Sequence, residues 1–288
     1  MEVALVLCAT VQFATAMTLF GGSLFRLLLS RATALDAALV RCLRMAALFA
    51  WISAAGWLML EAANFGTGWS DALNPSVLFA VVTDTYFGHL WAVRLTISLM
   101  LMLLVQALPS RSAYGVVTGL AAIFLGSLAL TGHALMDNGW LHPLSQMVHL
   151  LAGGAWIGAL PPLIIALRQP VSAEGDALAV EATQLFAPLG SLAVAFVVAS
   201  GLINGWLLVG GFSGLFFTTY GQVLLAKLAL VGGMLICAAI NRFRLAPGLA
   251  LLREGRARLR RVVTIEIGLS LAVLGAASLL GTLQPVFR

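Results

Sequence analysis

Residues 131–163 read TGHALMDNGWLHPLSQMVHLLAGGAWIGALPPL, and this stretch lies between long apolar segments. It contains three of the four histidines of the chain, and two methionines accompany them. These residues are His133, Met136, His142, Met147 and His149. Because polar side chains are scarce elsewhere in the chain, their concentration here indicates a metal site, a haem site or a hydrated membrane interface.

The composition indicates an integral membrane protein. Of the 288 residues, 61% are hydrophobic and only 9% are charged, whereas a soluble domain carries about 25% charged residues. A membrane-spanning helix needs roughly 20 apolar residues, and segments of this kind cover residues 3–28, 43–63, 89–108, 113–134, 145–167, 183–209, 219–240 and 263–283. We therefore predict an all-α fold of about eight transmembrane helices in contact with membrane lipid.

The charged residues predict how these helices are oriented. The odd-numbered connections and their borders hold the arginines 26, 31, 41, 44, 111, 168, 242, 244, 253, 256, 258, 260 and 261. The even-numbered connections hold Asp71, Asp84 and Asp137. The positive-inside rule then places the odd connections in the cytoplasm and both termini outside. The net charge of +5 is explained by topology and by contact with anionic lipid, so we do not expect nucleic-acid binding.

An internal repeat relates the two halves of the chain. Residues Thr85–Leu95 (TYFGHLWAVRL) match Thr218–Leu228 (TTYGQVLLAKL) in the pattern threonine, any residue, aromatic, glycine, and then a basic residue six positions on. Both copies start on the same side of the membrane, which predicts a parallel four-plus-four repeat with halves 1–140 and 141–288. A weaker match aligns Gly21–Leu24 with Gly158–Pro161.

The four histidines do not follow this repeat. His89 is replaced by Gln222 in the second copy, and His149 corresponds roughly to Gln12 in the first. With the predicted topology, all four histidines lie at the outer end of the membrane. A one-sided grouping of this kind indicates a functional site, because ionisable groups inside a membrane are costly.

Two kinds of side chain in this stretch could bind a metal. Imidazole suits copper, zinc and iron, and thioether suits cuprous copper. His142, Gln146 and His149 follow i, i+4, i+7 spacing, so a helix starting near His142 would present them on one face. Met136 and Met147 are near enough in sequence to add thioethers, and His89 would join from span 3. The alternative for each histidine is an interfacial side chain hydrogen-bonded to loop carbonyls.

Charged residues inside the spans form a second set of candidates. Arg94 and Lys227 either extend to the outer interface or pair with external carboxylates such as Asp84 and Glu61. Glu266, near the cytoplasmic start of span 8, is expected to be neutralised by an arginine of the basic connection, with a role in proton or metal exit as the alternative.

Several motifs together resemble the copper resistance protein D (CopD) family of bacterial membrane proteins. They are GHA at 132–134, HLLAGGAWIGAL at 149–160, TTYGQVLLAKLAL at 218–230, Asn241-Arg242, LGTL at 280–283 and TYFGHLWAVRL at 85–95. The resemblance implies an inner-membrane protein of copper homeostasis that moves copper across the membrane, often with a small periplasmic CopC-type partner. His133 and His149 match family positions, whereas His142 and His89 rest on the spatial reasoning above.

The leading hypothesis is therefore a copper-binding permease. No Walker A loop, HExxH or GxSxG element is present, so we do not expect a hydrolase or an ATP-driven pump. The alternative is a haem b redox protein, in which two of His89, His133 and His149 ligate the iron from both faces. Whether the protein is an enzyme depends on this choice, because only the haem protein would be an oxidoreductase.

Overall fold

The computed structural model describes residues 1–30, 33–107, 111–131, 139–209, 212–245 and 253–285. These residues form helices and connecting turns without strands. The elements are α1 (Glu2–Leu28), α2 (Thr33–Phe65), η1 (Trp69–Asp71), α3 (Pro75–Asp84), α4 (Tyr86–Leu104), α5 (Arg111–Ser127), η2 (Leu128–Leu130), α6 (Leu141–Ile157), α7 (Leu160–Leu167), α8 (Ala173–Leu208), α9 (Phe212–Phe217), α10 (Thr219–Ile240), the π-helix η4 (Asn241–Leu245) and α11 (Arg253–Leu280).

The prediction of eight transmembrane helices is confirmed. In the described part of the chain, eight helical stretches are long and apolar enough to cross a membrane. The main difference is length, because α2 begins at Thr33, well before the predicted start of this span at residue 43. Leu35, Leu39 and Leu43 are all fully buried, and their i, i+4, i+8 spacing keeps one apolar face of the helix in the core.

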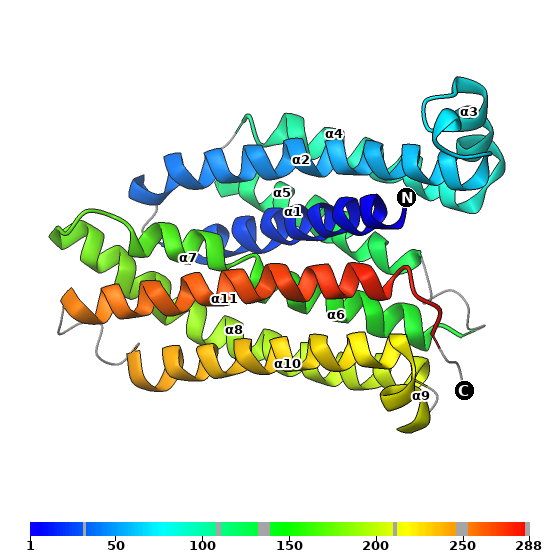
Figure 1. The fold of residues 1–288 in the computed structure, drawn as a ribbon. Coiled ribbons are helices and arrows are strands. Elements are labelled where there is room, and N and C mark those ends of the chain that lie inside the picture. The colour runs from blue at the N-terminus through cyan, green and yellow to red at the C-terminus, as the bar shows by residue number, and fades with distance from the viewer. Residues whose placement is uncertain (31–32, 108–110, 132–138, 210–211, 246–252, 286–288) are drawn as a thin grey trace.

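The spans alternate in direction, so the bundle has two ends (Figure 1). We call the end with both termini, α3 and α9 the terminal end. The opposite end holds the ends of α1, α4, α7 and η4 and the beginnings of α2, α5, α8 and α11 (Figure 1), and we call it the basic end because most of the described arginines lie there. Two termini at one end agree with the predicted alternation of the spans, while the side of the membrane that each end faces stays a prediction.

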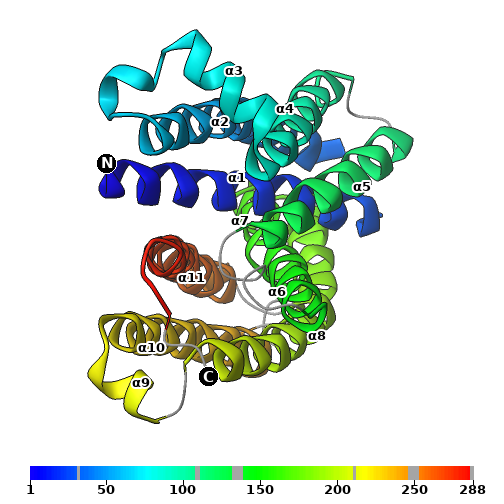
Figure 2. The same ribbon diagram turned by 90° about the vertical axis from the view of Figure 1, so that its right-hand side faces the viewer.

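Helix α1 lies at the centre of the bundle and packs against α2, α5, α6 and α11 (Figure 2). Glycines allow the contact between α1 and α6 to be close. A Cβ atom on Gly158 would lie 1.9 Å from the Met17 carbonyl oxygen, and one on Gly21 would lie 2.2 Å from the Gly154 carbonyl oxygen. Small residues at such crossings are how membrane helices gain close packing without a hydrophobic driving force.

The matched segments of the repeat have the same local structure. Thr85 caps α4 by accepting a hydrogen bond from the Gly88 amide at 2.9 Å, and Thr218 caps α10 by accepting one from the Gly221 amide at 3.0 Å. A Cβ atom on Gly88 would lie 1.9 Å from the Val81 carbonyl oxygen, and one on Gly221 would lie 2.2 Å from carbonyl oxygens of α9. The shared threonine and glycine are thus explained by capping and by close packing on a preceding short helix. The four-plus-four repeat of the whole chain stays a prediction.

Span 5 consists of two helices, α6 and α7, separated at Gly158 and Ala159. Pro161 and Pro162 follow, and neither has an amide hydrogen to donate to the preceding turn. The carbonyl groups of Ile157 and Gly158 therefore lack their usual intrahelical donors. The interruption lies where α1 crosses this span.

Candidate metal site

His149 lies in α6, where α6 packs against α8. Its Nδ1 atom is 3.1 Å from the Val197 carbonyl oxygen and 3.0 Å from the Ser200 hydroxyl oxygen. A carbonyl oxygen only accepts hydrogen bonds, so Nδ1 carries the proton and Nε2 has a free lone pair. Metal-binding histidines are commonly oriented in this way, with one ring nitrogen donating to a carbonyl and the other left to bind the metal.

Polar residues of α6 and α8 continue from the His149 ring towards the terminal end. Ser145 donates to the Ser200 carbonyl oxygen at 3.2 Å, and Asn204 Nδ2 donates to Gln146 Oε1 at 2.8 Å. The Oδ1 atom of Asn204 is buried and has no partner among the described residues. Ser200 and Asn204 were missed in the sequence, although two polar residues four positions apart in a long apolar run are a recognisable signal.

Gly201 gives the His149 ring its space against α8. A Cβ atom at this position would lie 3.3 Å from His149 Cε1, which is tighter than most contacts of a real Cβ atom. The glycine therefore allows the ring to lie flat against the helix that orients it.

His142 lies seven residues before His149, at the first turn of α6, and only 3% of it is exposed. The predicted i, i+4, i+7 face is consistent with the structure, because Gln146 and His149 both bond to α8. His142, Gln146 and His149 therefore belong to one helix at the terminal end.

Met147 lies on a different side of α6. A Cβ atom on Gly126 of α5 would lie 3.3 Å from Met147 Cγ, so this side chain packs against α5 while His149 faces α8. Positions two apart on a helix point to opposite sides. The structure does not bring these two predicted ligands together.

His89 is separated from the histidines of α6. It is exposed at the start of α4, and its Nε2 atom lies 2.8 Å from the Thr83 carbonyl oxygen at the end of α3. Helix α4 packs against α2, α3 and α5, whereas α6 packs against α1, α5 and α8, so α5 lies between them (Figure 2). The remaining predicted ligands, His133 and Met136, lie outside the described residues.

Arg94 does not extend to the interface, and it does not pair with Asp84 or Glu61. It is fully buried, and its Nε donates to the Ser127 hydroxyl at 3.1 Å. Its Nη2 donates to the Ser127 carbonyl oxygen and, at 3.3 Å, to the Thr131 hydroxyl. Its guanidinium also lies 4.5 Å from the centre of the Trp91 ring, so neutral groups and an aromatic face replace the predicted carboxylate.

Lys227, at the corresponding position of α10, is half-buried, and no ion pair between it and a carboxylate is present among the described residues.

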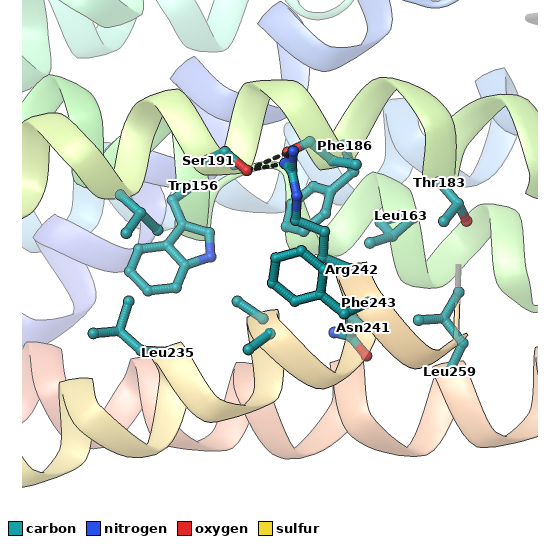
Figure 3. Close-up of a pocket in the computed structure, with 15 residues that line it drawn as sticks. Trp156, Leu163, Thr183, Phe186, Ser191, Leu235, Asn241, Arg242, Phe243 and Leu259 are labelled. Atoms are coloured by element: carbon teal, nitrogen blue, oxygen red, sulfur yellow. Dashed lines mark hydrogen bonds between the residues drawn. The ribbon is translucent and has the colours of Figure 1, made fainter. Parts of the chain in front are cut away.

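The predicted neutralisation of Glu266 by an arginine is wrong. The carboxylate is fully buried and accepts hydrogen bonds from Trp156 Nε1 at 2.8 Å and from Asn241 Nδ2 at 3.2 Å. Arg242, the adjacent arginine, instead donates to the Ala187 carbonyl oxygen of α8 at 2.9 Å and to the Ser191 hydroxyl (Figure 3).

Within the described ranges, no three His, Cys, Asp or Glu side chains lie close enough together to hold a metal ion. The structure thus supplies one well-oriented imidazole, a second buried one on the same helix, and polar groups around them. This defines a class of protein: a helical membrane protein with eight spans and a candidate ligand site at one end.

Comparison with known proteins then shows the family. The family description "Copper resistance protein D-like, N-terminal domain" matches residues 1–143, and "Copper resistance protein D" matches residues 180–280. The chain belongs to the copper resistance protein D family, and it is a multi-pass inner-membrane protein.

Three relatives agree with this assignment. The inner membrane protein YebZ of Escherichia coli (strain K12) is 30% identical over 285 residues, which cover 96% of each chain. Copper resistance protein D of Pseudomonas syringae pv. tomato is 33% identical over 242 residues, covering 79% of this chain and 77% of the relative. The copper transport protein CutJ of Bacillus subtilis (strain 168) is 29% identical over 228 residues, covering 77% of this chain and 41% of the relative. No solved structure matches the chain.

Proposed function

We propose that the protein binds copper at the terminal end, through His149, and lets it cross the inner membrane without ATP hydrolysis. The observation that carries this proposal is the pair of contacts from His149 Nδ1 to Val197 and Ser200, which leaves Nε2 free as a ligand atom. The family and the names of two relatives supply copper as the metal.

The ligands of this site would come from α6 and from the segment before it. His142 lies on the same helix, and His133 and Met136 precede it in the sequence. Neutral imidazoles and thioethers hold copper without burying a large negative charge, and moderate affinity lets the ion leave again. His89 and Met147 are weaker candidates, because they face other parts of the bundle.

The terminal end would face the periplasm, because the arginines gather at the other end. A small periplasmic copper carrier of the CopC type would then deliver copper at this end. His149 would accept the ion near the surface, in the first half of span 5.

Copper binding by the purified protein in lipid nanodiscs tests the proposal. We expect His149→Ala to weaken the affinity for Cu(I) by at least about tenfold, because disturbing even an indirect contact of a metal site has effects of this size. His89→Ala is the matched comparison, and we expect a smaller loss because α5 separates this histidine from α6. Cellular copper accumulation should fall in a His133→Ala/His149→Ala double variant, and unchanged uptake by a well-expressed double variant would contradict the proposal.

The haem alternative is tested by the visible spectrum of the same preparation. The free Nε2 atom of His149 would also suit haem iron, but the described residues do not place a second histidine opposite it. A Soret band that disappears in His149→Ala would replace copper transport with haem chemistry.

A further inference from the structure

Helices α10 and α11 enclose a thioether, a thiol and a carboxylate in the interior of the bundle. Met234 is 1% exposed, Cys237 is 9% exposed and Glu266 is fully buried. None of these side chains belongs to the His149 site. They lie in the halves of their helices that lead towards the basic end.

The spacing of these residues places them on facing sides of the two helices. Met234 and Cys237 are three positions apart on α10, and Glu266 and Ser270 are four apart on α11, so each pair shares a face. The Ser270 hydroxyl lies 3.9 Å from Met234 Sδ, and Asn241, four positions after Cys237 on the same side of α10, donates to Glu266 at 3.2 Å. The two sulfur atoms and the carboxylate therefore belong to one cluster, which we call the Glu266 cluster.

The Glu266 cluster lacks a positive charge. Its carboxylate is held only by the neutral donors Trp156 and Asn241, and no described basic side chain forms an ion pair with it. The Oδ1 atom of Asn241 is also buried without a partner in the described structure. A buried carboxylate without a counter-charge is costly, so the uptake of a proton or a cation at this position would be favourable.

A cavity of about 280 Å³ lies beside the cluster, and Trp156 and Asn241, the two donors to Glu266, form part of its wall (Figure 3). Arg242 also lines the cavity, but its guanidinium is held by α8. The cluster therefore adjoins this cavity, and Arg242 reaches across the cavity from η4 to α8 (Figure 3).

We propose that Met234 and Cys237 bind one cuprous ion as it passes through the membrane interior, while Glu266 accepts the proton that Cys237 releases. Thioether and thiolate sulfur are the ligands that select Cu(I). Coordination converts the Cys237 thiol to a thiolate, whose negative charge balances the monovalent ion, and the Glu266 carboxylate takes the proton, so the loaded cluster is neutral. This inference rests on the proposed function, because it adds a second binding position to the same path.

The test is the number and type of copper ligands in purified protein in nanodiscs, loaded with Cu(I) without oxygen. Cu(I) held by bicinchoninate serves as the competing probe, and X-ray absorption at the copper edge reports sulfur ligands. The variants are Met234→Leu/Cys237→Ser, Glu266→Gln and His149→Ala. Cys42→Ser/Met102→Leu is the matched control, because it removes the same atoms from the first half of the bundle.

We expect the Met234→Leu/Cys237→Ser variant to bind one Cu(I) fewer per chain and to lose the sulfur-ligand signal in X-ray absorption. The control variant should keep this copper ion and its sulfur-ligand signal. Glu266→Gln keeps the shape of the side chain and should weaken the interior affinity by at least about tenfold. His149→Ala should keep the sulfur-bound copper. Equal copper content and equal sulfur scattering in wild type and the Met234→Leu/Cys237→Ser variant would overturn the inference, as would wild-type affinity in Glu266→Gln.

The outcomes separate this inference from the proposed function. If the sulfur-bound copper is found and the His149→Ala variant binds copper as tightly as the wild type, the His149 site is rejected and the Glu266 cluster is not. If copper binding is weakened by His149→Ala but is unchanged in the Met234→Leu/Cys237→Ser and Glu266→Gln variants, the Glu266 cluster is rejected and the His149 site is not. A Met234→Leu/Cys237→Ser variant that does not fold is replaced by Glu266→Gln, whose affinity decides the question.

Discussion

The contact between α1 and α6 should be intolerant of a single methyl group. In a Gly158→Ala variant the new Cβ atom would lie 1.9 Å from the Met17 carbonyl oxygen and 2.6 Å from the Gly154 carbonyl oxygen. Both neighbours are backbone atoms, so no change of side-chain rotamer can relieve the overlap. The two helices would have to separate by about 1 Å to restore a normal contact, and closely packed interiors transmit such shifts.

The size of the effect follows from two opposing terms. Overpacking costs about 1–3 kcal/mol, and a clash between backbones belongs at the upper end of this range. Gly158 has a backbone conformation that alanine also adopts, so replacing it contributes about 1 kcal/mol in the other direction through the lower entropy of the unfolded chain. We therefore expect the free energy of unfolding to fall by about 2 kcal/mol in Gly158→Ala.

Gly232→Ala in α10 is the matched control, because a Cβ atom there would have no neighbour within 4 Å. Reversible unfolding in mixed detergent micelles, followed by tryptophan fluorescence, would measure both free energies. The control should be as stable as the wild type or slightly more stable. A Gly158→Ala variant that matches Gly232→Ala would refute the close crossing of α1 and α6.

Three further outcomes are expected. Ser200→Ala should weaken Cu(I) binding by about tenfold or more, because it removes one of the two acceptors that orient His149; binding as tight as in wild type would argue against this orienting role. Arg94→Met should lower the free energy of unfolding much less than Arg94→Ala, because methionine replaces the buried charge with a similar apolar volume. Equal free energies of unfolding in the two variants would argue against this expectation. The Thr67 amide and hydroxyl hold the pKa of the Asp71 carboxyl below its usual range. The ordered loop 66–74 should therefore persist at neutral pH and loosen only as the pH falls below about 4. Amide hydrogen exchange of this loop, corrected for its intrinsic pH dependence, would measure the loosening, and an onset near pH 6 would contradict the prediction.

The membrane-spanning helices were predictable, because each depends on local composition. Each span has its own apolar run, and the caps at Thr85 and Thr218 depend on residues within one turn. The break at Gly158 was also marked in the sequence by Pro161 and Pro162, since consecutive prolines interrupt a helix.

The partners of the polar residues were not predictable in the same way. Glu266 bonds to Trp156, 110 positions away, and Arg94 bonds to Ser127 at the end of the next span. Such pairs depend on which helices become neighbours and how they are rotated, and neither is specified by hydropathy. The nearest opposite charge along the sequence was therefore a poor guide to the partner of a buried charged residue. Neutral hydrogen-bonding groups occupy the places where ion pairs were predicted.

The candidate site was predictable at the level of the helix. The shared face of His142, Gln146 and His149 follows from helical spacing, and the same spacing shows that Met147 lies on another face. The role of Ser200 required the pairing of α6 with α8, which one sequence does not reveal.

The interruption of span 5 affects how the molecule can move. A regular helix resists bending because each bend stretches hydrogen bonds, but the carbonyl groups of Ile157 and Gly158 have no intrahelical donor to lose. Span 5 can therefore change its angle at this level without breaking its own ladder, and this is the level at which it contacts α1. His149 lies on one side of this joint and α7, which leads to the basic end, lies on the other.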